Sequence, residues 1–237
     1  MATSVEIRQT AIRVIRWMVL GAAGGAWAGF FVGGGTGRIA MLVLRLTSDD
    51  SLRGVETDDG FEIGTFSTGT LFLMIFCAVF GALTGVVYVA IRWVLPAPYR
   101  VLVAAMLGAL VGGALILHGD GIDFHVLEPR WLAIAMFIVI PGITTAAVAW
   151  LVERWDAWWF VNRRRTALMA APLILPFFLI GLAIAAVAVV PILTFGSQSD
   201  RIRSAVHRFG PLLGRAALLV VASLGGWAVV NDVTAIL

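Results

Sequence analysis

Long apolar runs separated by short polar connections make up most of this chain. A helix that crosses the hydrocarbon core of a bilayer needs about 20 mostly apolar residues, and it satisfies its own backbone polar groups there. The pattern therefore predicts an all-α membrane protein, a single transmembrane domain over 1–237 with about six transmembrane helices in a bundle. The predicted spans are 15–34, 70–94, 101–117, 131–151, 168–195 and 211–230.

The fifth run, 168–195, is unusual because it is long and carries Pro172, Pro176 and Pro191. Its residues, about 28, are too few for two full crossings at about 1.5 Å of rise per residue. It either spans the bilayer once or re-enters the side it left, which would move the C-terminus to the other side. The single crossing is the preferred interpretation.

The outer connection 35–68 is expected to hold two small elements. Residues 37–46 form an amphipathic run with an arginine near each end, which predicts a short helix on the membrane surface. Further on, Asp-Asp-Gly at 58–60 lies between alternating apolar residues, and Asp-Gly in that setting is typical of a hairpin turn. The pattern predicts a small extracytoplasmic β-hairpin there.

Composition supports lipid as the surrounding solvent. Hydrophobic residues make up 60% of the chain and charged residues 13%, whereas about a quarter of a soluble domain is charged. All 17 basic residues are arginine, so a Schiff-base lysine and a P-loop lysine are excluded. The single cysteine, Cys77, can form no internal disulfide.

The distribution of arginines predicts the orientation in a cell membrane. Arginines gather in the N-terminal tail and in the connections at 92–100 and 153–165, whereas 35–68 and 118–130 are acidic. Because basic connections stay on the cytoplasmic side, the N-terminus is predicted to be cytoplasmic. The preferred six-span order then places 196–210 outside, although that connection is basic; a re-entrant fifth run would remove the conflict.

Glycines recur every four residues in the first three runs. This spacing places them on one helical face, and small residues allow membrane helices to approach closely. The favoured interpretation is packing within the chain; docking of another protein or a second copy, and a glycine-lined transport path, are the alternatives. The predicted packing residues are Gly21, Gly25, Gly29, Gly33, Gly81, Gly85, Gly108 and Gly112.

The second outer connection contains the residue types of a metal site. Imidazole and carboxylate groups suit zinc or manganese, but the spacing matches no EF-hand and no H-E-x-x-H helix. A polar connection between two spans is therefore the favoured interpretation, and no cofactor is expected. If a metal binds, its expected ligands are His118, Asp120, Asp123 and His125.

A tryptophan and arginine belt follows the fourth run. Tryptophan prefers the headgroup level, where arginine meets lipid phosphate, so this segment is predicted to lie at the inner lipid interface. Three consecutive arginines are far short of a basic groove for nucleic acid. The predicted interface residues are Trp155, Trp158, Trp159, Arg163, Arg164 and Arg165.

Signs of catalysis are missing from the sequence. No predicted span contains a histidine, and there is neither a G-x-S-x-G motif nor a pair of intramembrane aspartates. We expect a non-enzymatic membrane protein, an accessory subunit or homo-oligomer that acts through helix packing or its outer loops. Its expected partners are lipids and either another membrane protein or itself. The alternative is a small channel or transporter with a glycine-lined path and an acidic outer mouth.

Three stretches carry a resemblance to a known group. They are 40–48 together with 57–64, the entry to the second span at 69–73, and 123–130. In these stretches the chain resembles uncharacterised multi-pass membrane proteins of actinobacteria, over most of its length. The resemblance implies a membrane location, and it implies no activity and no functional residues.

Overall fold

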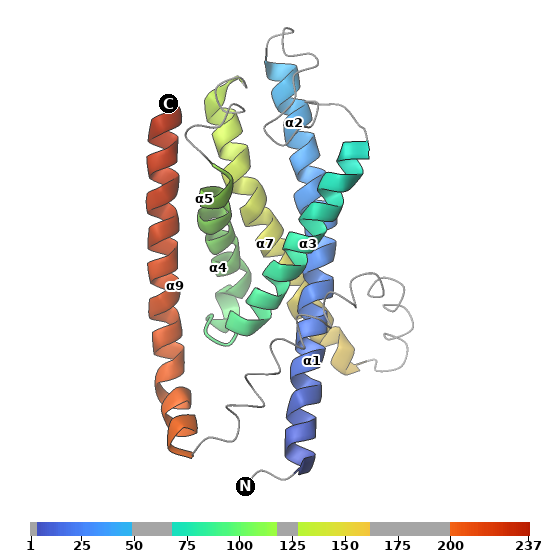
Figure 1. The fold of residues 1–237 in the computed structure, drawn as a ribbon, viewed down its shortest axis with the longest axis vertical. Coiled ribbons are helices and arrows are strands. Elements are labelled where there is room, and N and C mark those ends of the chain that lie inside the picture. The colour runs from blue at the N-terminus through green and yellow to red at the C-terminus, as the bar shows by residue number, and fades with distance from the viewer. Residues whose placement is uncertain (1–3, 49–67, 118–127, 162–199) are drawn as a thin grey trace.

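The computed structural model describes residues 4–48, 68–117, 128–161 and 200–237, and all regular structure in them is helical (Figure 1). Five helices are long and apolar enough to cross a membrane. The prediction of an all-helical, multi-pass membrane protein is confirmed at this level. Both the β-hairpin expected around 58–60 and the fifth apolar run, 168–195, lie outside the described residues. The five candidate spans are Arg16–Thr47, Gly69–Ile91, Ala97–Ile116, Arg130–Ala157 and Gly210–Ile236.

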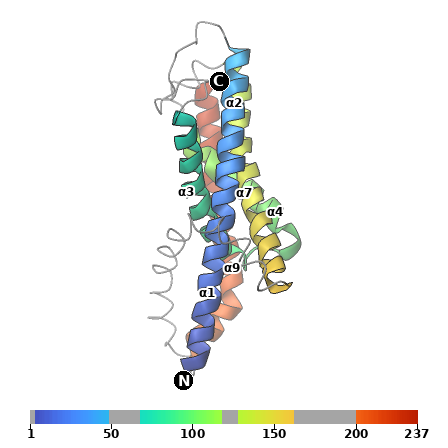
Figure 2. The same cartoon turned by 90° about the vertical axis from the view of Figure 1, so that its right-hand side faces the viewer.

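The first span is one continuous rod built from α1 (Ser4–Trp27), the π-helical segment η1 (Ala28–Gly34) and α2 (Gly35–Thr47) (Figure 2). The prediction of a separate surface helix at 37–46 is therefore wrong. The backbone at Gly34 and Gly35 keeps right-handed helical angles, and no proline interrupts the helix there. Within this segment Arg38 and Leu44 are buried in the bundle, whereas Ile39 and Leu46 stay exposed on the side of the span.

The second and third spans are joined by a short turn. The second span is α3 (Thr68–Ile91), and a turn through Pro96 leads into the 3-10 turn η3 (Ala97–Tyr99). Proline fixes φ and has no amide hydrogen to donate, so it separates the two helices at this turn. The third span comprises α4 (Arg100–Leu107), the π-helical segment η4 (Gly108–Gly112) and α5 (Gly113–Ile116).

The remaining helices are α7 (Arg130–Val161) and α9 (Asp200–Ile236). Helix α7 runs through the middle of the bundle and contacts the first three spans, whereas α9 lies at the edge beside α4 and α5 (Figure 1). The main core cluster joins α7 to η1, α3, the following turn and α4 through small and branched side chains. Its buried members are Ala28, Tyr88, Val89, Leu95, Ala104, Val148, Ala149 and Val152.

Helix α9 runs in the direction opposite to the preferred prediction. The Nε of Arg215, near its start, donates a hydrogen bond to the carbonyl of Val94 at 3.1 Å, and Arg130 donates to the carbonyl of Ile236 at 3.4 Å. The last span therefore starts at the end of the bundle that holds the 92–100 turn. The start of α9 at Asp200 disagrees with the preferred placement of the 196–210 connection, and the alternative, with the two chain ends at opposite ends of the bundle, agrees with the direction of α9 (Figure 1).

Candidate functional site

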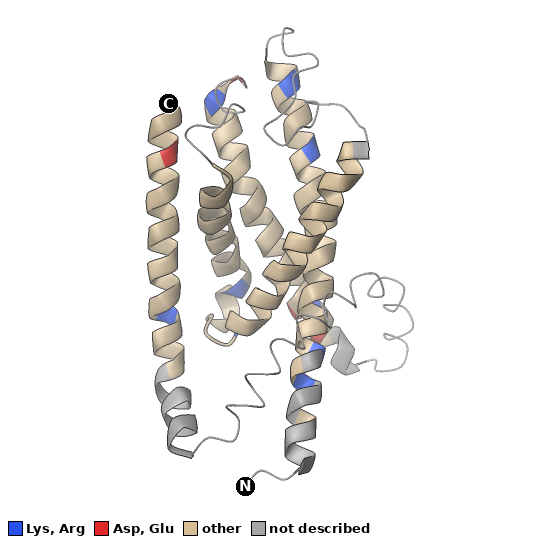
Figure 3. Ribbon diagram, viewed as in Figure 1, with Lys and Arg blue, Asp and Glu red and all other residues tan. Residues whose placement is uncertain are grey.

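Charged side chains of the described residues lie toward the two ends of the bundle, with an apolar region between them (Figure 3). At one end, three arginines and two carboxylates from separate segments come together. We call this group the ionic cluster. It consists of Arg16 on α1, Arg92 after α3, Arg100 at the start of α4, and Glu153 and Asp156 on α7.

Asp156 binds two guanidinium groups with different oxygens. Arg16 Nη2 lies 2.6 Å from Oδ1, and Arg92 Nη2 lies 2.8 Å from Oδ2. The side chain of Asp156 is only 11% exposed, so both charge-assisted bonds are largely shielded from water. Such bonds are shorter and stronger than neutral ones. One carboxylate thereby joins α1 and the end of α3 to α7.

Glu153 lies one turn before Asp156 on the same face of α7. It accepts a hydrogen bond from the hydroxyl of Tyr88 at 2.8 Å, and Arg100 Nη1 lies 3.3 Å from its Oε2. Arg92 Nε is 3.8 Å from its Oε1 and so bridges the two carboxylates. The guanidinium of Arg92 also stacks over the ring of Trp17, 5.5 Å from its centroid.

The ionic cluster is suited to hold helices together and poorly suited to catalysis. Each carboxylate is held by at least one guanidinium, so the cluster contains no free general acid or base. No group of three or more histidine, cysteine, aspartate or glutamate residues that could hold a metal exists in the part of the chain that the structure describes. The cluster therefore joins α1, α3, α4 and α7 at one level.

Sequence reasoning missed this cluster. The signal was present, because Glu153 and Asp156 are the only acids in the connection 153–165 and stand three residues apart. That spacing places both on one helical face. Which of the many arginines would face them depends on how the helices cross, and no local pattern specifies that crossing.

The predicted glycine faces lie inside the bundle. Gly21, Gly25 and Gly29 face α3, where they meet Gly85, Gly81 and the carbonyl of Cys77. A Cβ added at Gly25 would overlap the carbonyl oxygen of Gly81, and one added at Gly21 would lie 2.6 Å from that of Gly85. The two backbones are therefore in direct contact. We call this interface the glycine seam.

A second close contact joins the third span to α7. A Cβ at Gly108 would overlap the hydroxyl of Thr145, and one at Gly112 would lie 2.5 Å from Cβ of Pro141. Thr145 donates its hydroxyl to the carbonyl of Pro141 at 2.8 Å, so this polar group is satisfied within its own helix. Gly33, in η1 of the first span, approaches Thr144, which is also on α7.

The remaining predicted residues are the expected metal ligands and the lipid-interface residues. The four expected metal ligands of the 118–125 stretch and the three arginines at 163–165 lie outside the described residues, as do the side chains of Trp158 and Trp159. Trp155 is half-buried on α7. It lies one residue from Asp156, so the C-terminal end of α7 carries both aromatic and ionic groups.

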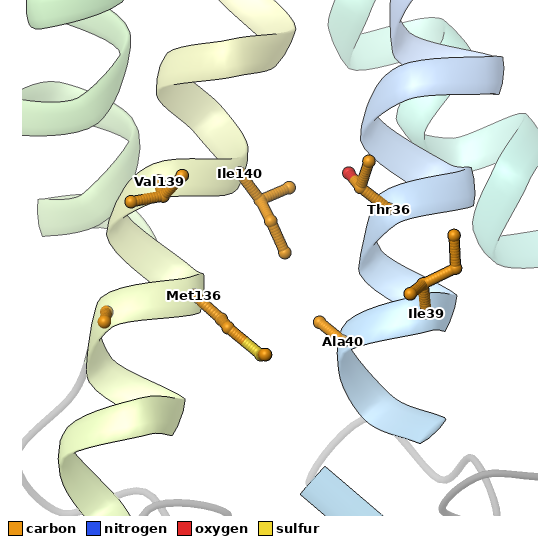
Figure 4. Close-up of a pocket in the computed structure, with 7 residues that line it drawn as sticks. Thr36, Ile39, Ala40, Met136, Val139 and Ile140 are labelled. Carbon is orange, nitrogen blue, oxygen red and sulfur yellow. The ribbon is translucent and has the colours of Figure 1, made fainter. Parts of the chain in front are cut away.

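A hollow lies between α2 and α7, on the side of the bundle. It has a volume of about 260 Å³. Met136 and Ile140 extend from α7 toward Ala40 and Thr36 on α2 (Figure 4). We call it the lateral groove. Its lining residues are Thr36, Ile39, Ala40, Ala135, Met136, Val139 and Ile140.

Comparison with known proteins adds no relative to this picture. No family model, no curated protein and no solved structure matches the chain. The resemblance to actinobacterial membrane proteins stays a prediction.

Proposed function

We propose that the chain is a non-enzymatic protein of the cell membrane that acts as an accessory subunit or a homo-oligomer, through its membrane-facing surfaces and outer loops. The observation that carries the proposal is the closed interior of the described helices. The glycine seam brings two backbones into contact, and the lateral groove, which has an apolar lining, lies on the side of the bundle. Described helices that pack this closely, with no free acid-base pair in their ionic cluster, favour action by binding.

The alternative, a small channel or transporter, receives less support. An ion path needs polar or ionisable groups at bilayer depth. In the described helices, the threonines beside Pro141 donate their hydroxyls to their own helix, at 2.8 Å each. The glycines that would line a path are covered by α3 and α7. Arg38 is a buried ionisable group within the first candidate span, but one such group does not make a path.

The orientation is part of the proposal. We place the ionic cluster at the cytoplasmic side, with the N-terminus inside and the C-terminus outside. In this arrangement Arg201, Arg203 and Arg208, near the start of α9, fall on the cytoplasmic side as the arginine rule requires. By their place along the chain, the only arginines on the outer side are Arg38, Arg45, Arg53 and Arg130.

The test is to purify the full chain in a mild detergent, measure the mass of the protein in the complex, and identify any protein that copurifies in stoichiometric amount. We expect a defined oligomer or one partner in fixed ratio. The same preparation in liposomes should pass neither ions nor small solutes above the rate of empty liposomes. A monomer without a partner that carries a saturable flux would overturn the proposal.

A further inference from the structure

Helices α2 and α7 touch at two levels and separate between them. At the inner level Gly33 approaches Thr144 so closely that an added Cβ would lie 3.3 Å from its methyl group. At the outer level the hydroxyls of Thr47 and Ser48 each donate to the carbonyl of Glu128, at 3.0 Å. The lateral groove is the space left between these two contacts. Both ends are therefore fixed by specific interactions.

The lining of the lateral groove offers nothing to a polar ligand. Its single hydroxyl, on Thr36, donates to the carbonyl of Val32 within its own helix. The other lining groups are hydrocarbon, apart from the thioether of Met136. Burying a polar group there without a hydrogen bond would cost about 1–3 kcal/mol, and a water molecule needs two to four polar partners to stay. Only an apolar occupant fits this chemistry.

The lateral groove is too small to enclose a helix. A helix with side chains is about 10 Å across and 5.4 Å per turn, so a single turn fills roughly 420 Å³. The groove holds about 260 Å³. At about 30 Å³ for each water-sized group, it accepts a slender chain of roughly eight or nine methylene-sized groups. A second copy, or another apolar helix, could insert only a side chain.

The position of the lateral groove determines where the occupant comes from. Both walls belong to candidate spans, Arg16–Thr47 and Arg130–Ala157. On the rim, Ile39 is 62% exposed and Val139 is 50% exposed, so the groove opens sideways at bilayer depth, where acyl chains are the surrounding solvent. We propose that the lateral groove binds one acyl chain of a membrane phospholipid. The flexible Met136 adapts the wall to it.

The test counts phospholipids that stay on the full chain. The protein is purified in a mild detergent and mixed with palmitoyl-oleoyl phosphatidylethanolamine or phosphatidylglycerol. Native mass spectrometry then measures the fraction of protein that carries bound lipid. Ala40 forms the floor of the groove and is 6% exposed, so Ala40→Phe fills it. We expect occupancy of the tightest-bound lipid to fall at least about tenfold, for both headgroups alike, because no charged residue lines the groove.

The matched control is Leu42→Phe, which adds an aromatic ring to the same helix outside the groove and should leave the occupancy unchanged. Ala135→Leu, from the opposite wall, gives a second test if Ala40→Phe fails to fold. A phospholipid with a photoreactive acyl chain provides a readout on the unmodified protein, with adducts expected at Met136 and Ile140 above those at Leu219, which is 69% exposed on α9.

Three results would overturn the proposal. The first is equal lipid occupancy in the unmodified protein and in both groove variants. The second is an adduct yield at Met136 no higher than at Leu219. The third is loss of a dimer, with lipid retained, when Ala40→Phe is made, since this would show that a side chain of a second copy fills the groove.

Discussion

The guanidinium of Arg92 and the carboxylate of Asp156 form an ion pair of 2.8 Å between residues 64 positions apart in the chain. Arg92 ends the second span and Asp156 lies near the end of the fourth. Both side chains are mostly buried, at 17% and 11% exposure. The pair thereby fixes the level at which these two spans meet, and Arg16 joins the first span to the same carboxylate.

We predict that Asp156→Asn lowers the free energy of unfolding by about 1.5–3 kcal/mol, the usual value of hydrogen bonds to charged groups. The variant leaves two guanidinium groups, Arg16 and Arg92, without their shared anion. Thermal unfolding in detergent measures the loss. The control is Arg154→Gln, an exposed neighbour on α7, which should shift the midpoint little. Equal midpoints for the two variants would mean that the ionic cluster does not hold the helices together.

A double-mutant cycle tests the same pair more strictly. With Arg92→Gln and Asp156→Asn, we expect the double variant to lose less stability than the two single losses added together, by about 0.5–3 kcal/mol. The reason is that each single change already removes the bond between Arg92 and Asp156, so the second change has less left to remove. Strictly additive losses would show that the ion pair forms but does not contribute to stability.

The glycine seam gives a contrast between two identical substitutions. Alanine is the better helix former by about 1 kcal/mol, so Gly35→Ala, where nothing lies within 4 Å, should leave stability unchanged or raise it. Gly25→Ala should lower it, because the new Cβ would overlap the carbonyl of Gly81 and overpacking costs about 1–3 kcal/mol. Gly25→Leu should disrupt the first span further. The comparison uses unfolding midpoints in one detergent.

If Gly25→Ala and Gly35→Ala raise the midpoint equally, α1 and α3 do not approach as closely as described. A fall for both variants would point instead to a general intolerance of alanine in this rod, and the seam would not be its cause.

The direction of α9 predicts opposite locations for the two chain ends. Reporter enzymes fused to the N-terminus and the C-terminus should show activity on opposite sides of the membrane, with the N-terminus inside. A cysteine introduced at Ala97, which is exposed in the turn before α4, should react from the same side as the N-terminal reporter. Both termini on one side would contradict the hydrogen bond between Arg215 and Val94.

The sequence predicted the helical spans well because two local factors decide them: the length of an apolar run, and the need of the backbone to form its hydrogen bonds within the helix. It placed the start of the second, third, fourth and last spans within a few residues of the structure. It failed at 37–46, where an amphipathic pattern pointed to a surface helix and the structure instead continues the first span through Thr47. Arg38 is buried and Ile39 is exposed there, and the sequence alone does not specify that arrangement.

The candidate site was harder to predict because it depends on pairing between distant helices. Spacing showed that Gly21, Gly25 and Gly29 share a face, and it could not show that this face meets Gly81 and Gly85. Likewise, the pairing of Arg16 and Arg92 on Asp156 follows from the crossing of three helices. The lateral groove is set by the two contacts at its ends, one of which is a hydroxyl-to-carbonyl bond 81 positions apart in the chain.

The account depends above all on the closed packing of the described helices, and cysteine accessibility measures it directly. Ala26 and Ala82 are both fully buried beside the glycine seam, so each is changed to cysteine in a Cys77→Ala background and exposed to a membrane-impermeant maleimide in native membranes. We predict no reaction from either side, while a cysteine at Ala97 reacts. Labelling of Ala26→Cys or Ala82→Cys in folded protein would reveal water along the seam and contradict the account.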